Sequence, residues 1–168
     1  MAETEFAEAY EADEQRIRGA ILTQPISALD PKPPVVVRPG MPVRDAVRLM
    51  TENHTGCVCV VERDVLLGIF TERDLLHAVQ AGVDAATTRV GELMTEKPET
   101  LRRQHGIAQA LNQMAEGGFR HIPIVDAAGR PVGIIAMRDI VRFIVSLFPD
   151  AVLNVPPDPK AIPTQYGG

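Results

Sequence analysis

The sequence has few aromatic residues and few cysteines. It contains no Trp, two Tyr and five Phe, although 45% of its residues are hydrophobic. A buried core must therefore consist mainly of aliphatic side chains, and 168 residues are enough for one compact domain or two very small ones. The two cysteines, Cys57 and Cys59, are too close in sequence for a favourable direct disulfide. Such cysteine usage is typical of a reducing compartment, so we expect a cytoplasmic protein.

Several classes of function lack their sequence signals. The net charge of −5 argues against a general nucleic-acid binder, which would carry a basic face. No apolar stretch of about 20 residues occurs, so we expect no membrane span and no membrane partner. The four histidines and two cysteines show no HxxH, HExxH or CxxC spacing, so we expect no metal site. Nucleophile-elbow, Walker and GxGxxG motifs are also missing, and we therefore expect no catalysis.

The chain contains an internal repeat. A shift of 64 residues superposes identical residues at many positions, among them Leu29 and Leu93, Pro34 and Pro98, Arg38 and Arg102, Ala46 and Ala110, Met50 and Met114, and Val61 and Val125. One additional residue then enters a turn, so that a shift of 65 superposes Gly68 on Gly133, Arg73 on Arg138 and Asp74 on Asp139. Self-similarity at a fixed spacing indicates two copies of one structural unit.

Each copy has the pattern lead-in strand, helix, strand, strand, helix. Apolar residues at i, i+3, i+4 and i+7 from Val43, and again from Ile107, predict two amphipathic helices. Strands follow at 57–61 and 121–125, then second strands that end at Phe70 and Ile135, then helices over 72–81 and 137–147. Because one such unit buries little surface alone, we expect an α/β fold of two β-α-β-β-α repeats packed sheet to sheet with pseudo-twofold symmetry.

The repeats divide the chain into four segments. We expect an acidic helical segment at 1–24, the first repeat at 25–83, the second repeat at 84–148 and an extended tail at 149–168. Five prolines in the tail disfavour a helix there. The late helix of the second repeat is hydrophobic on nearly all sides, from Ile140 to Phe148. One small module provides too little cover for such a helix, so we expect a homodimer.

The two strand-to-helix junctions carry the most specific motif. They read Gly-Ile-Phe-Thr-Glu-Arg-Asp at 68–74 and Gly-Ile-Ile-Ala-Met-Arg-Asp at 133–139. Together with Gly-Gly-Phe-Arg-His-Ile-Pro-Ile-Val-Asp at 117–126 and Val-Gly-Glu-Leu-Met-Thr at 90–95, they resemble a tandem pair of CBS domains, or Bateman module. The resemblance covers about residues 25–148. It implies a non-catalytic sensor that binds AMP, ADP or ATP in the cleft between the repeats, with NAD or S-adenosylmethionine as alternatives.

The resemblance also implies the site residues. Asp74 and Asp139 would hold ribose hydroxyls, and Thr71 would contact a phosphate at a helix N-terminus, where unpaired N–H groups favour an anion. Backbone of the lead-in strands and of the second strands would flank adenine, and basic residues would reach the phosphate. The full expected set is Ile69, Phe70, Thr71, Arg73, Asp74, Arg120, His121, Ile134, Ile135, Arg138 and Asp139.

Each of these residues also has a structural interpretation. Thr71 and Asp74 fit a helix capping box, which is compatible with ligand binding. Arg120 could be a solvated surface residue, and His121 a hydrogen-bonded core histidine. Arg73 and Arg138 could form ion pairs on helix surfaces, worth about 0–1 kcal/mol.

The second junction departs from the motif at one position. Ala136 stands where the family has Thr or Ser, so it cannot donate to a phosphate. The loss of one charge-assisted hydrogen bond costs about 1.5–3 kcal/mol, or one to two orders of magnitude in affinity. We therefore expect the Asp74 site to bind more tightly than the Asp139 site.

Three hypotheses for the function remain open. The first is an adenosine-ligand sensor that is read by an unknown effector protein. The second is a ligand-free scaffold or interaction module, which the change at Ala136 favours slightly. The third is a redox switch at Cys57 and Cys59, which requires exposed thiols with a lowered pKa, whereas buried core cysteines would be inert.

Overall fold

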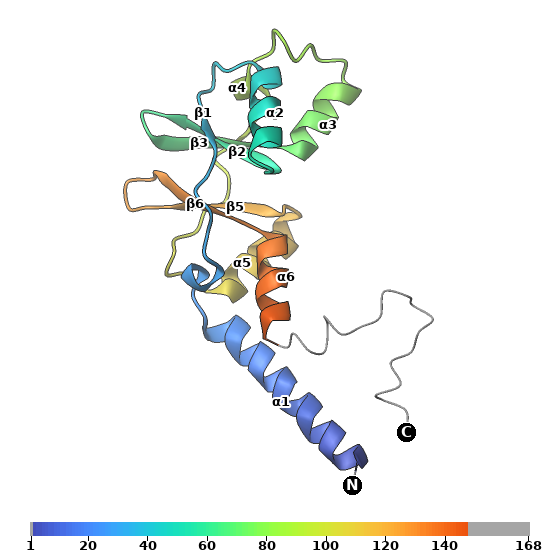
Figure 1. The fold of residues 1–168 in the computed structure, drawn as a ribbon. Coiled ribbons are helices and arrows are strands. Elements are labelled where there is room, and N and C mark those ends of the chain that lie inside the picture. The colour runs from blue at the N-terminus through green and yellow to red at the C-terminus, as the bar shows by residue number, and fades with distance from the viewer. Residues whose placement is uncertain (1, 148–168) are drawn as a thin grey trace.

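The computed structural model describes residues 2–147, with side chains for Glu11 and from residue 14 onward. Two α/β units are stacked, and a long helix extends from one end (Figure 1). In chain order the elements are α1 (Ala2–Thr23), the 3-10 helix η1 (Ile26–Leu29), β1 (Val36–Val37), α2 (Val43–Glu52), β2 (Cys57–Glu62), β3 (Val65–Thr71), α3 (Glu72–Gln80), α4 (Val90–Leu93), β4 (Thr95–Glu96), α5 (Ile107–Gly117), β5 (His121–Val125), β6 (Pro131–Ala136) and α6 (Met137–Ser146). The predicted α/β class and element order are confirmed.

The two sheets repeat the same strand pairing. In the first sheet, of order β1-β2-β3-β4, β1 runs parallel to β2 and places Val37 beside Val60. In the second unit β5 and β6 form an antiparallel pair, and an isolated parallel bridge joins Leu101 to Ile124. Leu101 and Ile124 lie 64 residues after Val37 and Val60, so the repeat seen in sequence is also a repeat of strand register.

Each repeat packs its opening segment against the other repeat. β4 lies near the start of the second repeat, yet it pairs with β3 of the first repeat. Lys32 lies near the start of the first repeat, yet it pairs with Ile134 on β6 of the second. The same exchange brings Ile26 into the core of the second unit and Val90 into the core of the first, both completely buried. The sequence pattern did not predict this exchange, which ties the two units together.

The repeated glycines make room for the exchanged segments. A Cβ atom on Gly68 would lie 2.9 Å from the carbonyl oxygen of Thr95 in β4. A Cβ atom on Gly133 would lie 2.9 Å from Cβ of Pro31. Both distances are shorter than ordinary van der Waals contact, so only glycine permits the crossing segment to approach at either position.

Each unit has its own aliphatic core between its sheet and its helices. The core of the first unit comprises Val37, Val43, Ala46, Met50, Val58, Val60, Phe70 and Val90. The core of the second comprises Ile26, Leu101, Ile107, Ala110, Met114, Ile122, Ile124, Ile135 and Ile140. Val58 and Val60 face the first core, so alternation along β2 turns Cys57 and Cys59 toward the other repeat. The sheets thus meet face to face, with helices outside (Figure 1).

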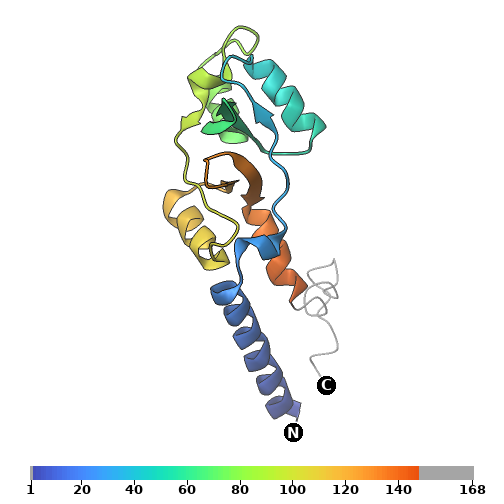
Figure 2. The same ribbon diagram turned by 90° about the vertical axis from the view of Figure 1, so that its left-hand side faces the viewer.

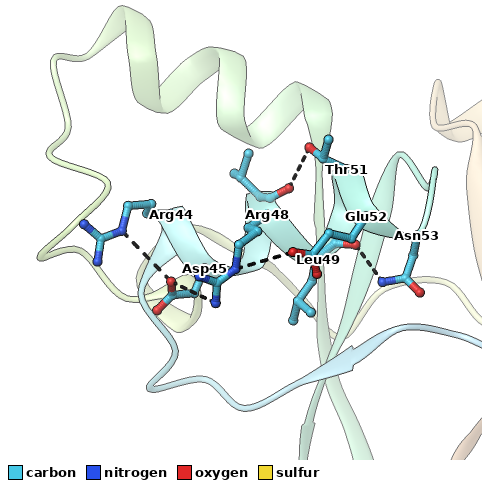
Figure 3. Close-up of polar contacts among 8 residues, drawn as sticks. Arg44, Asp45, Arg48, Leu49, Thr51, Glu52 and Asn53 are labelled. Atoms are coloured by element: carbon cyan, nitrogen blue, oxygen red, sulfur yellow. Dashed lines mark hydrogen bonds and ion pairs between the residues drawn. The ribbon is translucent and has the colours of Figure 1, made fainter.

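The outer face of α2 is a solvated ion-pair surface. Arg48 lies 3.5 Å from a carboxylate oxygen of Asp45 and 3.8 Å from one of Glu52. The amide of Asn53 donates to the carbonyl oxygen of Leu49 at the end of the helix (Figure 3). Exposed pairs of this kind contribute about 0–1 kcal/mol, so this face supports the helix and offers no site.

Helix α1 leaves the second unit as a single rod, as both views show (Figure 2). Its C-terminal end is fixed by backbone bonds: the Ile107 N–H donates to the carbonyl oxygen of Gln24 at 3.0 Å, and the Ile26 N–H to that of His105 at 2.7 Å. The predicted extended tail at 149–168, and Phe148, lie outside the described residues.

Candidate functional site

The first junction places a capping box at the edge of a cavity. The Thr71 N–H and hydroxyl donate to the same oxygen of Asp74, Oδ2, at 2.8 and 2.7 Å. The Asp74 N–H donates back to Thr71 Oγ1 at 3.4 Å, so α3 begins with the predicted cap. Within the described residues no hydrogen bond or ion pair engages Asp74 Oδ1. One acceptor oxygen is therefore left for a ligand.

Both repeats contribute walls to this cavity, which we call the Asp74 pocket. Its volume is about 300 Å³. Its lining residues are Gly56, Ile69, Thr71, Glu72, Arg73, Asp74, Thr95, Lys97, Pro98, Glu99, Phe119, Arg120 and His121. Six of the residues expected from sequence are thus gathered at one place. Phe70 is not among them, because it points to the opposite face of β3 and is completely buried in the first core.

The exchange of lead-in segments brings in residues that the motif did not reveal. Thr95, Lys97, Pro98 and Glu99 reach the pocket because β4 pairs with β3. Lys97 adopts a left-handed backbone conformation, with φ of 45°. Such a conformation is uncommon for a residue with a side chain, and it occurs here in the lining of the pocket. The sequence signals near this segment were the recurrence of Pro34 at Pro98 and the lead-in motif at 90–95, neither of which named a side chain of the site.

Arg73 links the two repeats. Its Nη1 donates to the carbonyl oxygen of Gly118, in the turn after α5, at 2.9 Å. This contact is a hydrogen bond to a backbone carbonyl and not the surface ion pair of the structural interpretation. The expected phosphate role of Arg73 stays a prediction. It holds α3 of the first repeat against the loop that presents Phe119 and Arg120 to the pocket.

His121 and Gly56 are neighbours in the lining of the pocket. A Cβ atom on Gly56 would lie 3.1 Å from Oε2 of Glu72 and 3.2 Å from Cε1 of His121. Burial lowers the pKa of His121, and the nearby guanidinium groups of Arg120 and Arg138 lower it further, while the carboxylate of Glu72 opposes them. The imidazole is therefore mainly neutral near pH 7, and the cations that line the pocket are Arg73, Lys97 and Arg120.

The second junction differs in how its aspartate is held. The Ala136 N–H donates to Asp139 Oδ2 at 2.8 Å, as Thr71 does to Asp74. The other oxygen, Oδ1, lies 3.6 Å from Nη1 of Arg142, so both oxygens are engaged. Ile135 is completely buried in the second core, and the Ile134 N–H donates to the carbonyl oxygen of Lys32 at 3.0 Å.

A second cavity, which we call the central pocket, lies between the repeats beside this junction. Its volume is about 500 Å³. Its lining residues are Val47, Met50, Thr51, His54, Thr55, Gly56, Glu72, Leu75, Arg120, His121, Ala136, Met137 and Arg138. Arg138 reaches this cavity, whereas Asp139 lines neither pocket. The two clefts are therefore unequal in shape as well as in sequence.

Comparison with known proteins identifies the fold family. The family model described as CBS domain matches residues 26–81 and again residues 90–146. The chain belongs to the CBS-domain family. The CBS pair is 35% identical over 109 residues to the mitochondrial CBS domain-containing protein CBSX3 of Arabidopsis thaliana, covering 61% of this chain and 52% of that one. The chain thus spans about half the length of that relative.

Solved structures of CBS pairs share the fold. The CBS domain protein PAE2072 from Pyrobaculum aerophilum, complexed with AMP, is 22% identical, with a TM-score of 0.66 over 73% of this chain and 99% of that one. The CBS domain pair of protein MJ0100, in complex with 5'-methylthioadenosine and S-adenosyl-L-methionine, is 21% identical, with a TM-score of 0.66 over 71% and 98%. At these identities the likeness shows the fold alone.

The two thiols of the CBS pair are buried between the sheets. Burial raises the pKa of Cys57 to about 11 and that of Cys59 to about 12. Thiols of this kind are poor nucleophiles, and this argues against the redox-switch hypothesis. Within the side chains that the structure describes, no three His, Cys, Asp or Glu residues gather as a metal site requires. No helix in the described part of the chain is long and apolar enough to cross a membrane.

Proposed function

We propose that this CBS pair is a non-catalytic regulatory module that binds AMP, ADP or ATP in the Asp74 pocket. The observation that carries the proposal is one cavity of about 300 Å³ that joins a ribose acceptor on the first repeat to a guanidinium on the second. A relative of this fold is complexed with AMP, and another with S-adenosyl-L-methionine, so NAD and S-adenosylmethionine are the alternative ligands.

The pocket offers a partner to each part of a nucleotide. Asp74 Oδ1 would accept the ribose hydroxyls, and the Thr71 hydroxyl would contact the phosphate. Arg120 would pair with the phosphate from the opposite repeat, because a guanidinium can donate two parallel hydrogen bonds to an oxyanion. The adenine would lie against the wall that Ile69 and Thr95, paired across β3 and β4, contribute to the pocket. Since the walls belong to both repeats, binding would change the angle between them.

In this proposal another protein detects the change in the angle between the repeats. A change in the inter-repeat angle alters the relative position of the outer helices, and an effector protein could recognise that change. The module would act in the cytoplasm, where its buried free thiols stay reduced. It would work as a homodimer, because Leu76 and Val79 on α3 and Val141 on α6 are 66%, 68% and 52% exposed.

Calorimetric titration of AMP, ATP, NAD and S-adenosylmethionine tests the proposal. We expect Asp74→Ala to weaken nucleotide binding by about ten- to a hundredfold, because a ribose acceptor is lost. Asp139→Ala is the matched control, since it removes the same N-terminal cap from α6, and we expect a much smaller loss. Equal losses would contradict the asymmetry of the two sites.

A thermal-shift series addresses the ligand-free scaffold directly. A ligand at 100 times its Kd should stabilise the fold by about 2.7 kcal/mol. If none of the four ligands raises the melting temperature, the scaffold interpretation replaces the sensor. Ala136 and the engaged Asp139 are the features that favour that second interpretation.

A further inference from the structure

We propose that Glu72 determines which adenosine ligands the Asp74 pocket accepts, and that its carboxylate favours ligands with at most one phosphate group over ADP and ATP. This inference rests on the proposed nucleotide site and narrows its ligand class. Glu72 is the first residue of α3 and lines the pocket. The residue at the same position of the second repeat, at the shift of 65, is the uncharged Met137. The negative charge at this position therefore belongs to the first junction alone.

The carboxylate of Glu72 is directed toward the space between the repeats. A Cβ atom on Gly56 would have Oε2 of Glu72 at 3.1 Å and Cε1 of His121 at 3.2 Å, so the carboxylate and the imidazole lie beside the same backbone position. Burial lowers the pKa of His121, and the Glu72 carboxylate opposes this shift. Burial raises the pKa of the Cys57 thiol, and the same carboxylate adds to that shift. The charge of Glu72 thus acts on interior groups, although the residue as a whole is exposed.

This carboxylate adjoins both proposed phosphate contacts. Glu72 follows Thr71 in the chain, and its neighbour His121 follows Arg120, so a phosphate between Thr71 and Arg120 would lie close to Glu72.

The N-terminus of α3 has few backbone donors left for a chain of phosphates. The Thr71 N–H donates to Asp74 Oδ2 at 2.8 Å, and the Asp74 N–H donates to Thr71 Oγ1 at 3.4 Å. The Glu72 N–H donates to the carbonyl oxygen of Gly56 at 3.1 Å. These three amides are engaged within the protein, so the negative charge of a ligand must be balanced by side chains.

The charged side chains of the pocket are equal in number. The lining contains three acidic and three basic residues, namely Glu72, Asp74 and Glu99, and Arg73, Lys97 and Arg120. Arg73 already donates to the carbonyl oxygen of Gly118 at 2.9 Å. Within the side chains that the structure describes, no ion pair neutralises Glu72. One phosphate group carries a charge of about −1.5 to −2 at pH 7, which Lys97 and Arg120 can balance. Further phosphates would find no third free cation in this lining.

Repulsion from Glu72 should therefore grow with each phosphate that a ligand adds. Like charges a few ångströms apart repel each other, and solvent and salt screen the repulsion where the groups are exposed. Because Glu72 is exposed, each charge interaction should change a Kd by at most about fivefold. Adenosine carries no phosphate, so its affinity should not depend on this carboxylate.

Calorimetric titration of adenosine, AMP and ATP tests the role of Glu72, in buffer of constant ionic strength without divalent cations. The wild-type protein should bind AMP more tightly than ATP. In Glu72→Gln the ratio of the ATP Kd to the AMP Kd should fall about three- to tenfold, while the Kd of adenosine stays constant. Glu72→Met copies the residue of the second repeat and should lower the ratio to the same extent. Glu62→Gln is the matched control, because Glu62 is an exposed residue of β2 that lines neither pocket, and its ratio should equal that of wild type.

Several results would overturn the proposal. Tighter binding of ATP than of AMP by the wild-type protein would show that the pocket accepts a polyphosphate. An unchanged ratio in Glu72→Gln, or an equal fall of the ratio in Glu62→Gln, would show that this carboxylate does not select the ligand. Either result would leave the nucleotide function itself in place. If adenosine, AMP and ATP all fail to bind to the wild-type protein, the proposed nucleotide function is wrong, and the selection by Glu72 is wrong with it.

Discussion

Two aspartates at the same position of the two repeats have different neighbours. Asp74 and Asp139 each accept a backbone N–H at 2.8 Å, from Thr71 and Ala136. Only Asp139 has its second oxygen beside an arginine, Arg142, and the residue at the corresponding position of the first repeat is His77. A single side chain one turn along the helix thus gives one of the two aspartates an exposed ion pair, worth about 0–1 kcal/mol, that the other lacks.

The titration of His121 makes a prediction at the scale of one residue. Its pKa is lowered in the folded state, chiefly by burial, so the unfolded chain binds a proton more readily. The free energy of unfolding should therefore be highest above about pH 6.5, the usual pKa of histidine, and should fall as the pH falls toward the folded pKa. In His121→Gln this part of the pH dependence should be missing. Urea unfolding between pH 5.5 and 8 measures the difference, and parallel curves for the two proteins would contradict it.

At the scale of elements, the exchange of lead-in segments shapes both the fold and the site. β4 crosses from the second repeat to β3 of the first, so that Thr95 in β4 and Lys97 just after it line the Asp74 pocket. The approach depends on Gly68, because no side chain fits between β3 and β4. One wall of the Asp74 pocket is therefore formed by an element that belongs to the other repeat in sequence.

Replacement of Gly68 should destabilise the protein, because an added side chain would occupy the space where β4 passes β3. In Gly68→Ala the new methyl group would meet the Thr95 carbonyl at 2.9 Å, so β4 must move. We expect a loss of about 1–3 kcal/mol in the free energy of unfolding, as for other overpacked sites. Gly40→Ala is the control, since no atom lies within 4 Å of its added Cβ. Urea unfolding compares them, and similar stabilities for the two variants would count against the close-approach explanation.

The sequence predicted the elements well because their signals are local. Apolar periodicity from Val43 predicted α2, and the predicted helix at 72–81 corresponds to α3 at Glu72–Gln80. The exchange left no such signal, because β1 and β4 are two residues long and their partners are set by tertiary packing. The junction motif accordingly predicted Thr71 and Asp74 at the pocket, but not Lys97 or Phe119.

At the scale of the whole molecule, the outer helices expose matching apolar residues. Leu76 on α3 and Val141 on α6 lie 65 residues apart and occupy the same position in their repeats, with 66% and 52% of each residue exposed. The pseudo-twofold relation thus produces two similar patches on one molecule. A second copy of the chain would cover both patches with its own, in a closed symmetric pair.

The dimer prediction follows from these patches. Light scattering at micromolar concentration should give twice the 18.3 kDa mass of one chain for the wild type. Leu76→Glu combined with Val141→Glu should give a monomer, because each buried carboxylate would lack a partner. Val36→Glu, which changes a valine with 49% exposure at the edge of the first sheet, should leave the dimer intact. A monomeric wild type would rule out the homodimer, and a dimeric double variant would place the interface elsewhere on the molecule.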